Sequence, residues 1–131
     1  MSVAPPYRKT LIVQGGGFRT SFTAGVLDAF LEVSFHPFDQ IIANSGGAIA
    51  SSYFLAGQRH SFIEAMSYLA QDPHFVQYSR FFQAQGLMDV DYFNVIARNI
   101  IPFQIEVALK QKAHTDIRFV ATSCEDGSAN Y

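Results

Sequence analysis

The chain has 131 residues, of which 49% are hydrophobic and 15% charged, and its formal net charge is −2. This length suits one domain with a buried core, and the absence of a dense Lys/Arg cluster argues against nucleic acid as a partner. No apolar run is long enough for a membrane span, and residues 1–9 lack the apolar segment of a signal peptide. The single cysteine, Cys124, cannot form an internal disulfide, so we expect a cytoplasmic protein.

Short apolar strands alternate with helical patterns in the first part of the chain. A strand is predicted at residues 11–13, because this apolar run is too short for a helix and stops at a glycine. Apolar residues at three-to-four spacing then predict a helix from residue 19 to the residues before Pro37. A second strand is predicted at 41–43, and a second helix at 46–56.

Three more helices are predicted further along. Ser61, with Glu64 three residues later, is typical of an N-cap and capping box, and predicts a helix that ends before Pro73. Residues 74–87 are aromatic and irregular, and we expect a flap over the site there. Its aromatic side chains from Phe75 to Phe82 either contact an acyl chain or fill the core. Asp89 and Asp91 start a helix at 89–101, where acidic residues favour the helix dipole. The last helix covers roughly 103–113.

The chain ends on a predicted hairpin. Residues 117–123 read as a strand, and Glu125-Asp-Gly-Ser that follows is a hairpin-turn signal. Cys124 at the end of this strand is predicted to pack in or near the core. The order of strands and helices implies an α/β fold with a parallel sheet wrapped by helices. Because the second hairpin strand has barely begun at Tyr131, we expect the chain to be a fragment of something longer.

The serine after the second predicted strand has small neighbours on both sides. Ser45 lies in Ala43-Asn-Ser-Gly-Gly47. Small residues suit a nucleophile elbow, because this sharp bend brings the strand and helix backbones almost into contact. The usual pattern is G-x-S-x-G, and Ala43 is the smallest change from its first glycine. On its own, the segment suits an ordinary N-cap serine equally well.

Three successive glycines follow the first predicted strand and open the first predicted helix. Gly15, Gly16 and Gly17 let backbone N–H groups approach an anion closely, and the helix N-terminus adds a favourable dipole. In acyl transfer, that anion is the oxygen of the tetrahedral intermediate. Arg19 adds a positive charge at the same place.

Two nucleotide-binding patterns compete for these glycines. Residues 15–20 nearly match a dinucleotide fingerprint, but that motif needs an acidic residue near the end of the second strand. Asp39 lies at the start of that strand instead, and Asn44 and Ser45 occupy its end. A P-loop fails because no Gly-Lys-Ser/Thr follows the glycines. Paired with the Ser45 turn, the glycine loop indicates serine acyl-ester chemistry.

Taken together, these residues resemble the patatin-like phospholipase family. The segments that carry the resemblance are Gln14-Gly-Gly-Gly-Phe-Arg19, Thr23-Ala-Gly-Val-Leu27, Asn44-Ser-Gly-Gly-Ala48, Gly86-Leu-Met-Asp-Val-Asp-Tyr92 and Phe119-Val-Ala-Thr-Ser-Cys-Glu-Asp126. The last two look like those of an uncharacterised bacterial patatin-like group. The resemblance implies a three-layer α/β/α fold with a mainly parallel central sheet, incomplete in this chain. Residues 1–9 would then be an N-terminal tail, and residues 10–131 the N-terminal portion of the patatin-like domain.

The same resemblance implies hydrolysis of lipid acyl esters by a Ser–Asp dyad, with no cofactor and no metal. Ser45 is then the nucleophile. The implied elbow residues are Asn44, Gly46 and Gly47, and the implied oxyanion residues are Gly15, Gly16, Gly17, Phe18 and Arg19. The partner is a lipid or acyl-ester substrate, and a peripheral membrane contact stays open. The chain departs from the family at Thr20, where a glycine is usual, and at Ala43.

The general base is the largest departure from the family. The resemblance implies an Asp in an Asp-Gly-Gly/Ala motif well downstream of the serine. The only Asp-Gly pair here is Asp126-Gly127, and its context predicts a hairpin tip rather than a catalytic loop. We therefore expect the base to lie in sequence outside these residues, with Asp126 as the candidate within them.

Three histidines after Ser45 suggest a Ser-Asp-His triad as an alternative. In that hydrolase fold several strands precede the elbow, whereas only one is predicted here. We therefore expect His60, His74 and His114 to be surface or capping residues. No two of them have the spacing of metal ligands.

A second class of function also remains, a non-catalytic α/β module. Its glycine loop would bind an anionic ligand such as a nucleotide or a lipid phosphate. That ligand would raise the stability of the fold without covalent chemistry, whereas a hydrolase forms a covalent intermediate on its serine.

Overall fold

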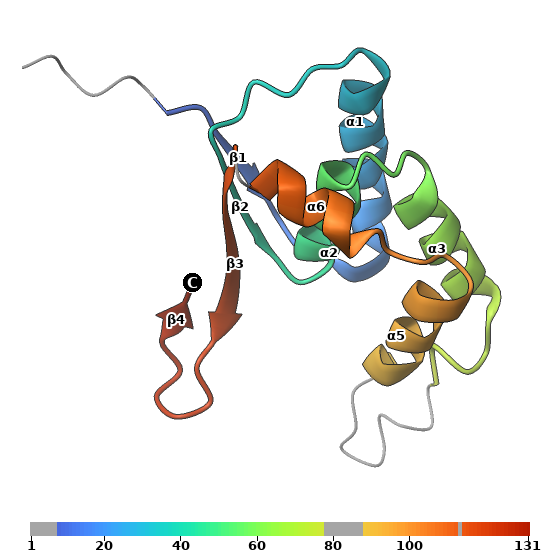
Figure 1. The fold of residues 1–131 in the computed structure, drawn as a ribbon. Coiled ribbons are helices and arrows are strands. Elements are labelled where there is room, and N and C mark those ends of the chain that lie inside the picture. The colour runs from blue at the N-terminus through green and yellow to red at the C-terminus, as the bar shows by residue number, and fades with distance from the viewer. Residues whose placement is uncertain (1–7, 78–87, 113) are drawn as a thin grey trace, which may run out of the picture.

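The computed structural model describes residues 8–77, 88–112 and 114–131 of the chain, with strands and helices alternating along most of it (Figure 1). The strands are β1 (Thr10–Val13), β2 (Gln40–Asn44), β3 (Asp116–Thr122) and β4 (Ala129–Asn130). The helices are the 3-10 turn η1 (Gly17–Arg19) and the α-helices α1 (Thr20–Glu32), α2 (Gly46–Leu55), α3 (Ser61–Gln71), α5 (Val90–Asn99) and α6 (Ile105–Lys112). These bounds confirm each strand and helix predicted from the sequence to within a few residues.

The described strands form one four-stranded sheet in the order β1-β2-β3-β4. β1, β2 and β3 run parallel, so that Ile12 pairs with Ile42 and Ile42 with Arg118. The predicted hairpin is present, because β4 pairs antiparallel with the end of β3. The α/β fold with a mainly parallel sheet is therefore confirmed.

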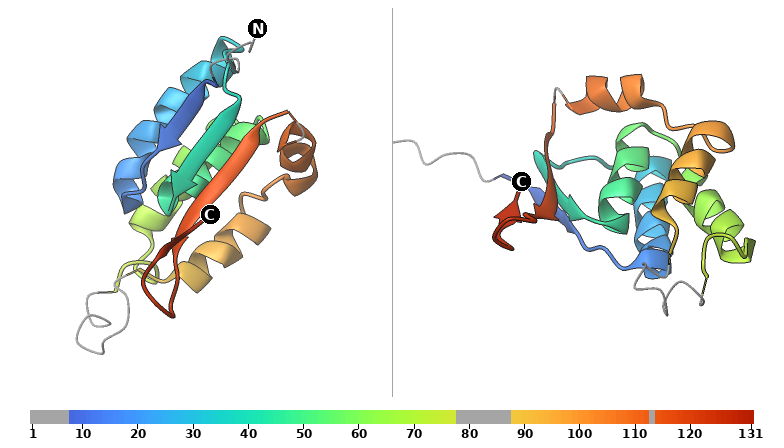
Figure 2. Two further views of the ribbon diagram at one scale, coloured as in Figure 1. Left: turned by 90° about the vertical axis from the view of Figure 1, so that its left-hand side faces the viewer. Right: turned by 90° about the horizontal axis from the view of Figure 1, so that it is seen from below.

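The helices cover one face of the sheet, and the opposite face is open in the described part of the chain (Figures 1 and 2). Val13, Ile41 and Ala43 are buried under the helices. Ile12, whose side chain points to the other face, is 76% exposed. Successive strand residues point to opposite faces, so this contrast identifies the covered side. The described residues thus supply two of the three layers that the family resemblance implies.

Helix α2 lies against the sheet and is buried along most of its length. Tyr53, Phe54 and Leu55 at its C-terminal end are 3–5% exposed. The Tyr53 hydroxyl donates a hydrogen bond of 3.1 Å to the carbonyl of Ile101, which satisfies the one polar atom of a buried ring. This bond ties α2 to the segment after α5. Ser45, which precedes α2, is thus attached to the best-packed helix of the fold.

Helix α1 leaves part of the apolar pattern that predicts it exposed to solvent. Phe22 is 81% exposed and Val33 is 71% exposed, although both belong to the apolar pattern that predicts the helix. The buried residues of α1 are Thr20, Ala24 and Leu27. Phe30 and Leu31 also pack partly against the core, so α1 buries the side that holds Ala24 and Leu27 and leaves Phe22 in solvent.

The start of α3 differs from the prediction. Ser61 is the first helical residue, and the N-cap is His60, in a left-handed conformation (φ 65°) without a side-chain cap. The His60 N–H donates to Asp28 Oδ2 of α1 at 3.0 Å instead. The predicted capping box is therefore wrong, because a tertiary contact with α1 sets where the helix starts.

The predicted position of Cys124 is also wrong, because this residue is exposed. It lies in the turn between β3 and β4, beyond the last strand residue Thr122. A residue just past the covered part of a strand has no helix above it, so apolar character alone does not bury it.

The predicted flap lies largely outside the described residues, which omit 78–87. Its two ends are held together: Val76 forms an antiparallel bridge with Met88, and the Asp89 N–H donates to the carbonyl of Phe75 at 2.9 Å. No described helix is long and apolar enough to cross a bilayer.

Gly47→Ala should destabilise the fold while Gly25→Ala should not. A Cβ at Gly47 would lie 2.6 Å from the Val13 carbonyl oxygen and 2.8 Å from that of Gln14, which are backbone atoms that cannot rotate away. We expect overpacking to cost about 1–3 kcal/mol in the free energy of unfolding, measured by urea titration.

Gly25→Ala is the matched control, because a Cβ in the middle of α1 meets nothing within 4 Å. It should raise the free energy of unfolding by up to about 1 kcal/mol, since alanine is the better helix former. Equal unfolding midpoints for the two variants would contradict the close approach of α2 to β1.

Candidate active site

Ser45 occupies a strained turn between β2 and α2. Its φ is 49° and its ψ is −133°, a backbone conformation that is rare for a residue with a Cβ. Its side chain makes no hydrogen bond to the first turn of α2. An N-cap serine adopts an extended backbone and uses its hydroxyl to accept such a bond. The geometry is therefore that of a strand-turn-helix elbow, with an exposed serine whose hydroxyl does not cap the helix.

The glycine loop after β1 packs directly against this turn. A Cβ on Gly15 would lie 2.7 Å from Cβ of Ser45, and one on Gly46 would lie 2.7 Å from Oγ1 of Thr20. Thr20 is 2% exposed, and its Oγ1 has no hydrogen-bond partner among the described atoms. These contacts explain why glycines are needed: any side chain at Gly15 or Gly46 would separate the loop from the elbow.

Two N–H groups of the predicted oxyanion region are already in use. The Gly15 N–H donates to Asn44 Oδ1 at 2.8 Å, and the Arg19 N–H donates to the carbonyl of Gly16 at 3.1 Å. Within the described part of the chain, the N–H groups of Gly16, Gly17 and Phe18 have no acceptor. These three donors are the ones left to hold an anion at the loop.

Arg19 lies beside the same loop. A Cβ on Gly16 would lie 3.3 Å from Arg19 Nε, so the exposed guanidinium borders the loop. Gly17 has a φ of 56°, in the left-handed region where glycine is favoured. The loop is therefore a strained backbone turn with a cation next to it, an arrangement suited to negative charge.

An apolar cavity of about 220 Å³ opens beside Ser45. Gly17, Phe18, Ser45 and Gly46 line it at one side, and the remaining lining side chains are apolar. These come from α2, α3, α5 and the segments that flank α5: Ile49, Phe62, Met66, Phe75, Met88, Val90 and Phe93. Ligand sites are commonly apolar cavities with few polar groups, and here the polar side chain is the serine.

The sequence predicts the serine, Gly17, Phe18 and Gly46 as site residues, but none of the apolar residues that line this cavity from α2, α3 and α5. Phe62, Met66 and Phe93 read as ordinary core positions of amphipathic helices, because nothing in a sequence separates a residue that lines a cavity from one that fills a core. Phe75 was singled out within the aromatic segment, with contact to a ligand or a place in the core as the alternatives. The structure places it at the cavity, in edge-to-face contact with Phe18.

A hydrogen-bonded cluster supports one wall of the cavity. The Tyr92 hydroxyl donates to Asp72 Oδ2 at 2.5 Å, and the His74 N–H donates to Asp72 Oδ1 at 2.8 Å. These bonds join the end of α3 to the start of α5. The bond from Tyr92 is the main cause that lowers the pKa of Asp72, and it raises the pKa of Tyr92 to about 12. Phe75 and Val90, which line the cavity, lie close in sequence to the residues that this cluster joins.

The predicted carboxylates have structural partners. Asp89 is the N-cap of α5 and accepts a hydrogen bond from the Tyr92 N–H at 2.9 Å, as expected for an acid at a helix start. Asp126 lies in the turn of the β3–β4 hairpin, where its Oδ1 accepts from the Ser128 N–H and hydroxyl at 3.0 and 2.7 Å. The Ser128 backbone bond is the chief cause that lowers the pKa of Asp126. Among the described atoms no hydrogen bond joins Asp126 to Ser45, and its role as base stays a prediction.

The three histidines after Ser45 are surface residues. His60 caps α3 and its ring lies 3.4 Å from Asp28, and the His74 ring lies 2.9 Å from Asp72. His114 is exposed. The prediction of surface or capping roles is therefore confirmed. Within the ranges that the structure describes, no group of three or more His, Cys, Asp or Glu residues is placed to hold a metal ion.

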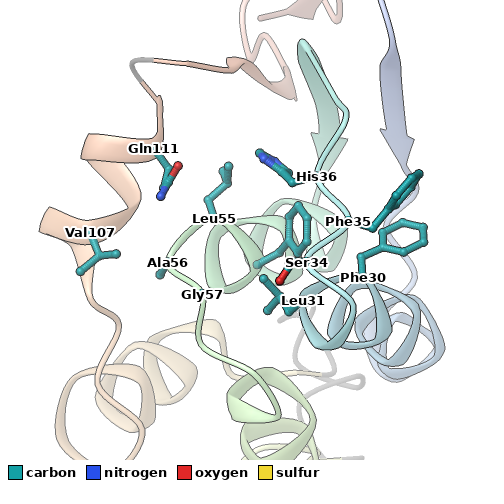
Figure 3. A pocket seen from close by; sticks show the side chains of 11 residues that line it. Phe30, Leu31, Ser34, Phe35, His36, Leu55, Ala56, Gly57, Val107 and Gln111 are labelled. Atoms are coloured by element: carbon teal, nitrogen blue, oxygen red, sulfur yellow. The ribbon is translucent and has the colours of Figure 1, made fainter.

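Another cavity, of about 310 Å³, lies at the far ends of α1 and α2 from Ser45 (Figure 3). It is lined by Leu31, Leu55 and Val107 among others, with His36 and Gln111 as polar members. Partial burial of the ring lowers the pKa of His36. The cavity is remote from the elbow, so we place the candidate site at the smaller cavity beside Ser45.

A family model for patatin-like phospholipase matches residues 11–123. The chain belongs to the patatin-like phospholipase family. The match begins in β1 and ends just after β3, so it includes the glycine loop and Ser45 but not the hairpin turn with Asp126. The resemblance to this family that the sequence motifs indicate is therefore confirmed.

A curated relative of this patatin-like chain is the uncharacterised protein YjjU of Escherichia coli (strain K12). The two are 32% identical over 105 residues, which cover 80% of this chain and 29% of the relative. The patatin-like chain thus spans less than a third of that relative's length. No solved structure gives a significant match.

Asp72→Asn should lower the pKa of Tyr92 from about 12 toward the ordinary value of 10. The carboxylate favours the neutral phenol by accepting its hydrogen bond, and a neutral amide accepts more weakly. The measurement is ultraviolet titration of tyrosine ionisation, with Tyr92→Phe to identify the band that belongs to Tyr92.

The matched control is Asp39→Asn, whose carboxylate accepts from the Lys9 N–H and contacts no tyrosine in the described structure. It should leave the titration unchanged. An unchanged pKa in the Asp72 variant would show that the Tyr92–Asp72 bond does not form in solution.

Proposed function

We propose that this protein hydrolyses carboxylic esters of lipids, with Ser45 as the nucleophile. The observation that carries the proposal is the elbow itself: a serine with φ 49°, whose hydroxyl does not cap its helix, at the edge of an apolar cavity. A strained backbone that other contacts hold in place is typical of functional sites. Membership of a family of lipid acyl hydrolases supports the same chemistry.

In the proposed reaction, Ser45 Oγ attacks the ester carbonyl carbon. The serine proton passes to a general base, and the carbonyl oxygen becomes an oxyanion held by N–H groups among those of Gly16, Gly17 and Phe18. The C–O bond to the alcohol then breaks, and the alcohol leaves with the proton. Water repeats the sequence on the acyl-enzyme, releasing the fatty acid and restoring the serine.

A carboxylate is the proposed base, as in the Ser–Asp dyad of the family. Asp126 is the candidate among the residues of this chain, because it follows β3 and so lies at the same edge of the sheet as the end of β2. Its pKa is lowered by the bonds from Ser128, so it is ionised at neutral pH as a base must be. The other source of the base is sequence beyond these residues.

The apolar cavity is the proposed site of the acyl chain. Burying a methylene group contributes about 0.8 kcal/mol, so several carbon atoms in a cavity lined by Ile49, Phe62 and Met66 would bind a long chain well. Phe18, Met88 and Val90 line the same cavity and are 36%, 40% and 66% exposed. Exposed apolar side chains around its mouth suit contact with a lipid surface, in a cytoplasmic protein.

Ser45→Ala should abolish covalent labelling by a fluorophosphonate, detected by intact mass, because the nucleophilic oxygen is gone. The wild-type chain should gain one adduct. Ser67→Ala, an exposed serine on α3, is the matched control and should be labelled like the wild type. Labelling that persists in the Ser45 variant would contradict the assignment.

Asp126→Asn extends the same test to the base. A large loss of labelling rate would support Asp126, and an unchanged rate would place the base elsewhere. A wild-type chain that stays unlabelled but is stabilised by a nucleotide or a lipid phosphate would favour the anion-binding module instead.

Ile49→Phe should shift selectivity toward short acyl chains, because a larger side chain beside Ser45 takes up part of a 220 Å³ cavity. We expect the ratio of kcat/KM for a decanoyl ester to that for a butyryl ester to fall roughly tenfold or more. Ile63→Phe on α3 is the control, since Ile63 packs against the core but does not line this cavity. An equal shift in both variants would argue against acyl binding here.

A further inference from the structure

We propose that Asn44 is a positioning residue, whose side chain holds the glycine loop in register with the nucleophile. The inference rests on the proposed function and adds a role that the motif alone does not specify. It is carried by one bond between two segments far apart in the sequence: the Gly15 N–H donates to Asn44 Oδ1 at 2.8 Å. Because an N–H group can only donate, the atom that faces Gly15 is the carbonyl oxygen of the side chain, and its NH₂ group points elsewhere.

The hydrogen bond between Gly15 and Asn44 lies just beyond the last paired residues of β1 and β2. The pairing of β1 with β2 stops at Val13 and Ala43, so no backbone ladder reaches the glycine loop. The backbone of Asn44 is still paired with Val120 of β3, on the other side of β2. The sheet therefore holds the backbone of Asn44 in place. Its side chain adds one more hydrogen bond between the end of β2 and the loop that follows β1.

The glycine loop needs this hydrogen bond because its own residues do not restrict the backbone conformation. Three successive glycines have many accessible backbone conformations, and donors to an oxyanion act best when they are preorganised. Pinning the Gly15 N–H fixes where the next two peptide groups begin, relative to Ser45. The close packing of Gly15 on the Cβ of Ser45 and the carbonyl of Asn44 leaves little room for a second arrangement.

The same bond separates two roles within the loop. The first N–H of the loop fixes the position of the loop relative to the elbow, while those of Gly16, Gly17 and Phe18 stay unpaired among the described atoms. Asn44 itself is exposed, so its loss removes little packing. A change in reaction rate without a change in stability is thus the expected signature of this residue.

The first experiment compares Asn44→Ala with the wild-type chain by two readouts. Exchange of the Gly15 amide hydrogen, followed by NMR, should become faster because its acceptor is gone. The rate of fluorophosphonate labelling of Ser45 should fall by up to roughly 10²-fold, as expected when reacting groups are slightly misplaced. The midpoint of thermal unfolding should match that of Asn94→Ala, a control at an exposed position on α5.

Asn44→Asp distinguishes positioning from general damage. It keeps an acceptor for the Gly15 N–H, so exchange of that amide should remain slow. It also places a negative charge beside the oxyanion, so labelling should be slowed at about pH 8 and should recover relative to wild type as the pH falls toward the ordinary range of an aspartate pKa. A residue that acts only in folding would not show this pH dependence.

The outcomes separate the two proposals. Wild-type labelling rates in Asn44→Ala, or unchanged exchange at Gly15, would overturn the role of Asn44 while leaving Ser45 as the nucleophile. A wild-type chain that is not labelled at all would overturn both, since no reaction would remain for the loop to be positioned for.

Discussion

The structure depends on a direct contact between two backbone turns that leave neighbouring parallel strands. The loop after β1 and the turn after β2 lie so close that a single Cβ at Gly15, Gly46 or Gly47 would meet other atoms at 2.6–2.7 Å. Gly47 packs on the carbonyls at the end of β1, which draws the N-terminus of α2 onto the sheet. Ser45 is thereby held in a backbone conformation that its side chain would otherwise disfavour.

That contact also decides which groups are available for chemistry. Two of the loop N–H groups are satisfied by the protein, one by a side chain of the elbow and one by the loop's own turn, and three are left unpaired in the described structure. Their residues are half-exposed or exposed, and they lie in the loop that packs against a serine with no capping role. The arrangement places backbone donors beside the serine and the Arg19 guanidinium beside the same loop.

The apolar cavity depends on a different set of forces. Its walls come from α2, α3 and the start of α5, and the Asp72 cluster joins the last two of these. One side of the cavity is therefore formed by α2, which packs on the sheet. The other side is formed by α3 and α5, which the hydrogen bonds to Asp72 hold together. Its exposed apolar rim and the open outer face of the sheet are among the apolar surfaces that remain uncovered in the described structure.

The sequence by itself determined the elements, the parallel order and the place of Ser45 at the turn between a strand and a helix. Those depend on local properties: the period of apolar residues, the glycine and proline residues that end helices and strands, and the small residues around Ser45. Only the tertiary structure decided which face of α1 is buried, that His60 and not Ser61 caps α3, that Cys124 is exposed, and which loop donors are free. Each of these depends on contacts with residues from a distant part of the chain, such as that of His60 with Asp28 or of Gly15 with Asn44. Local sequence patterns do not reveal which distant residues will be in contact.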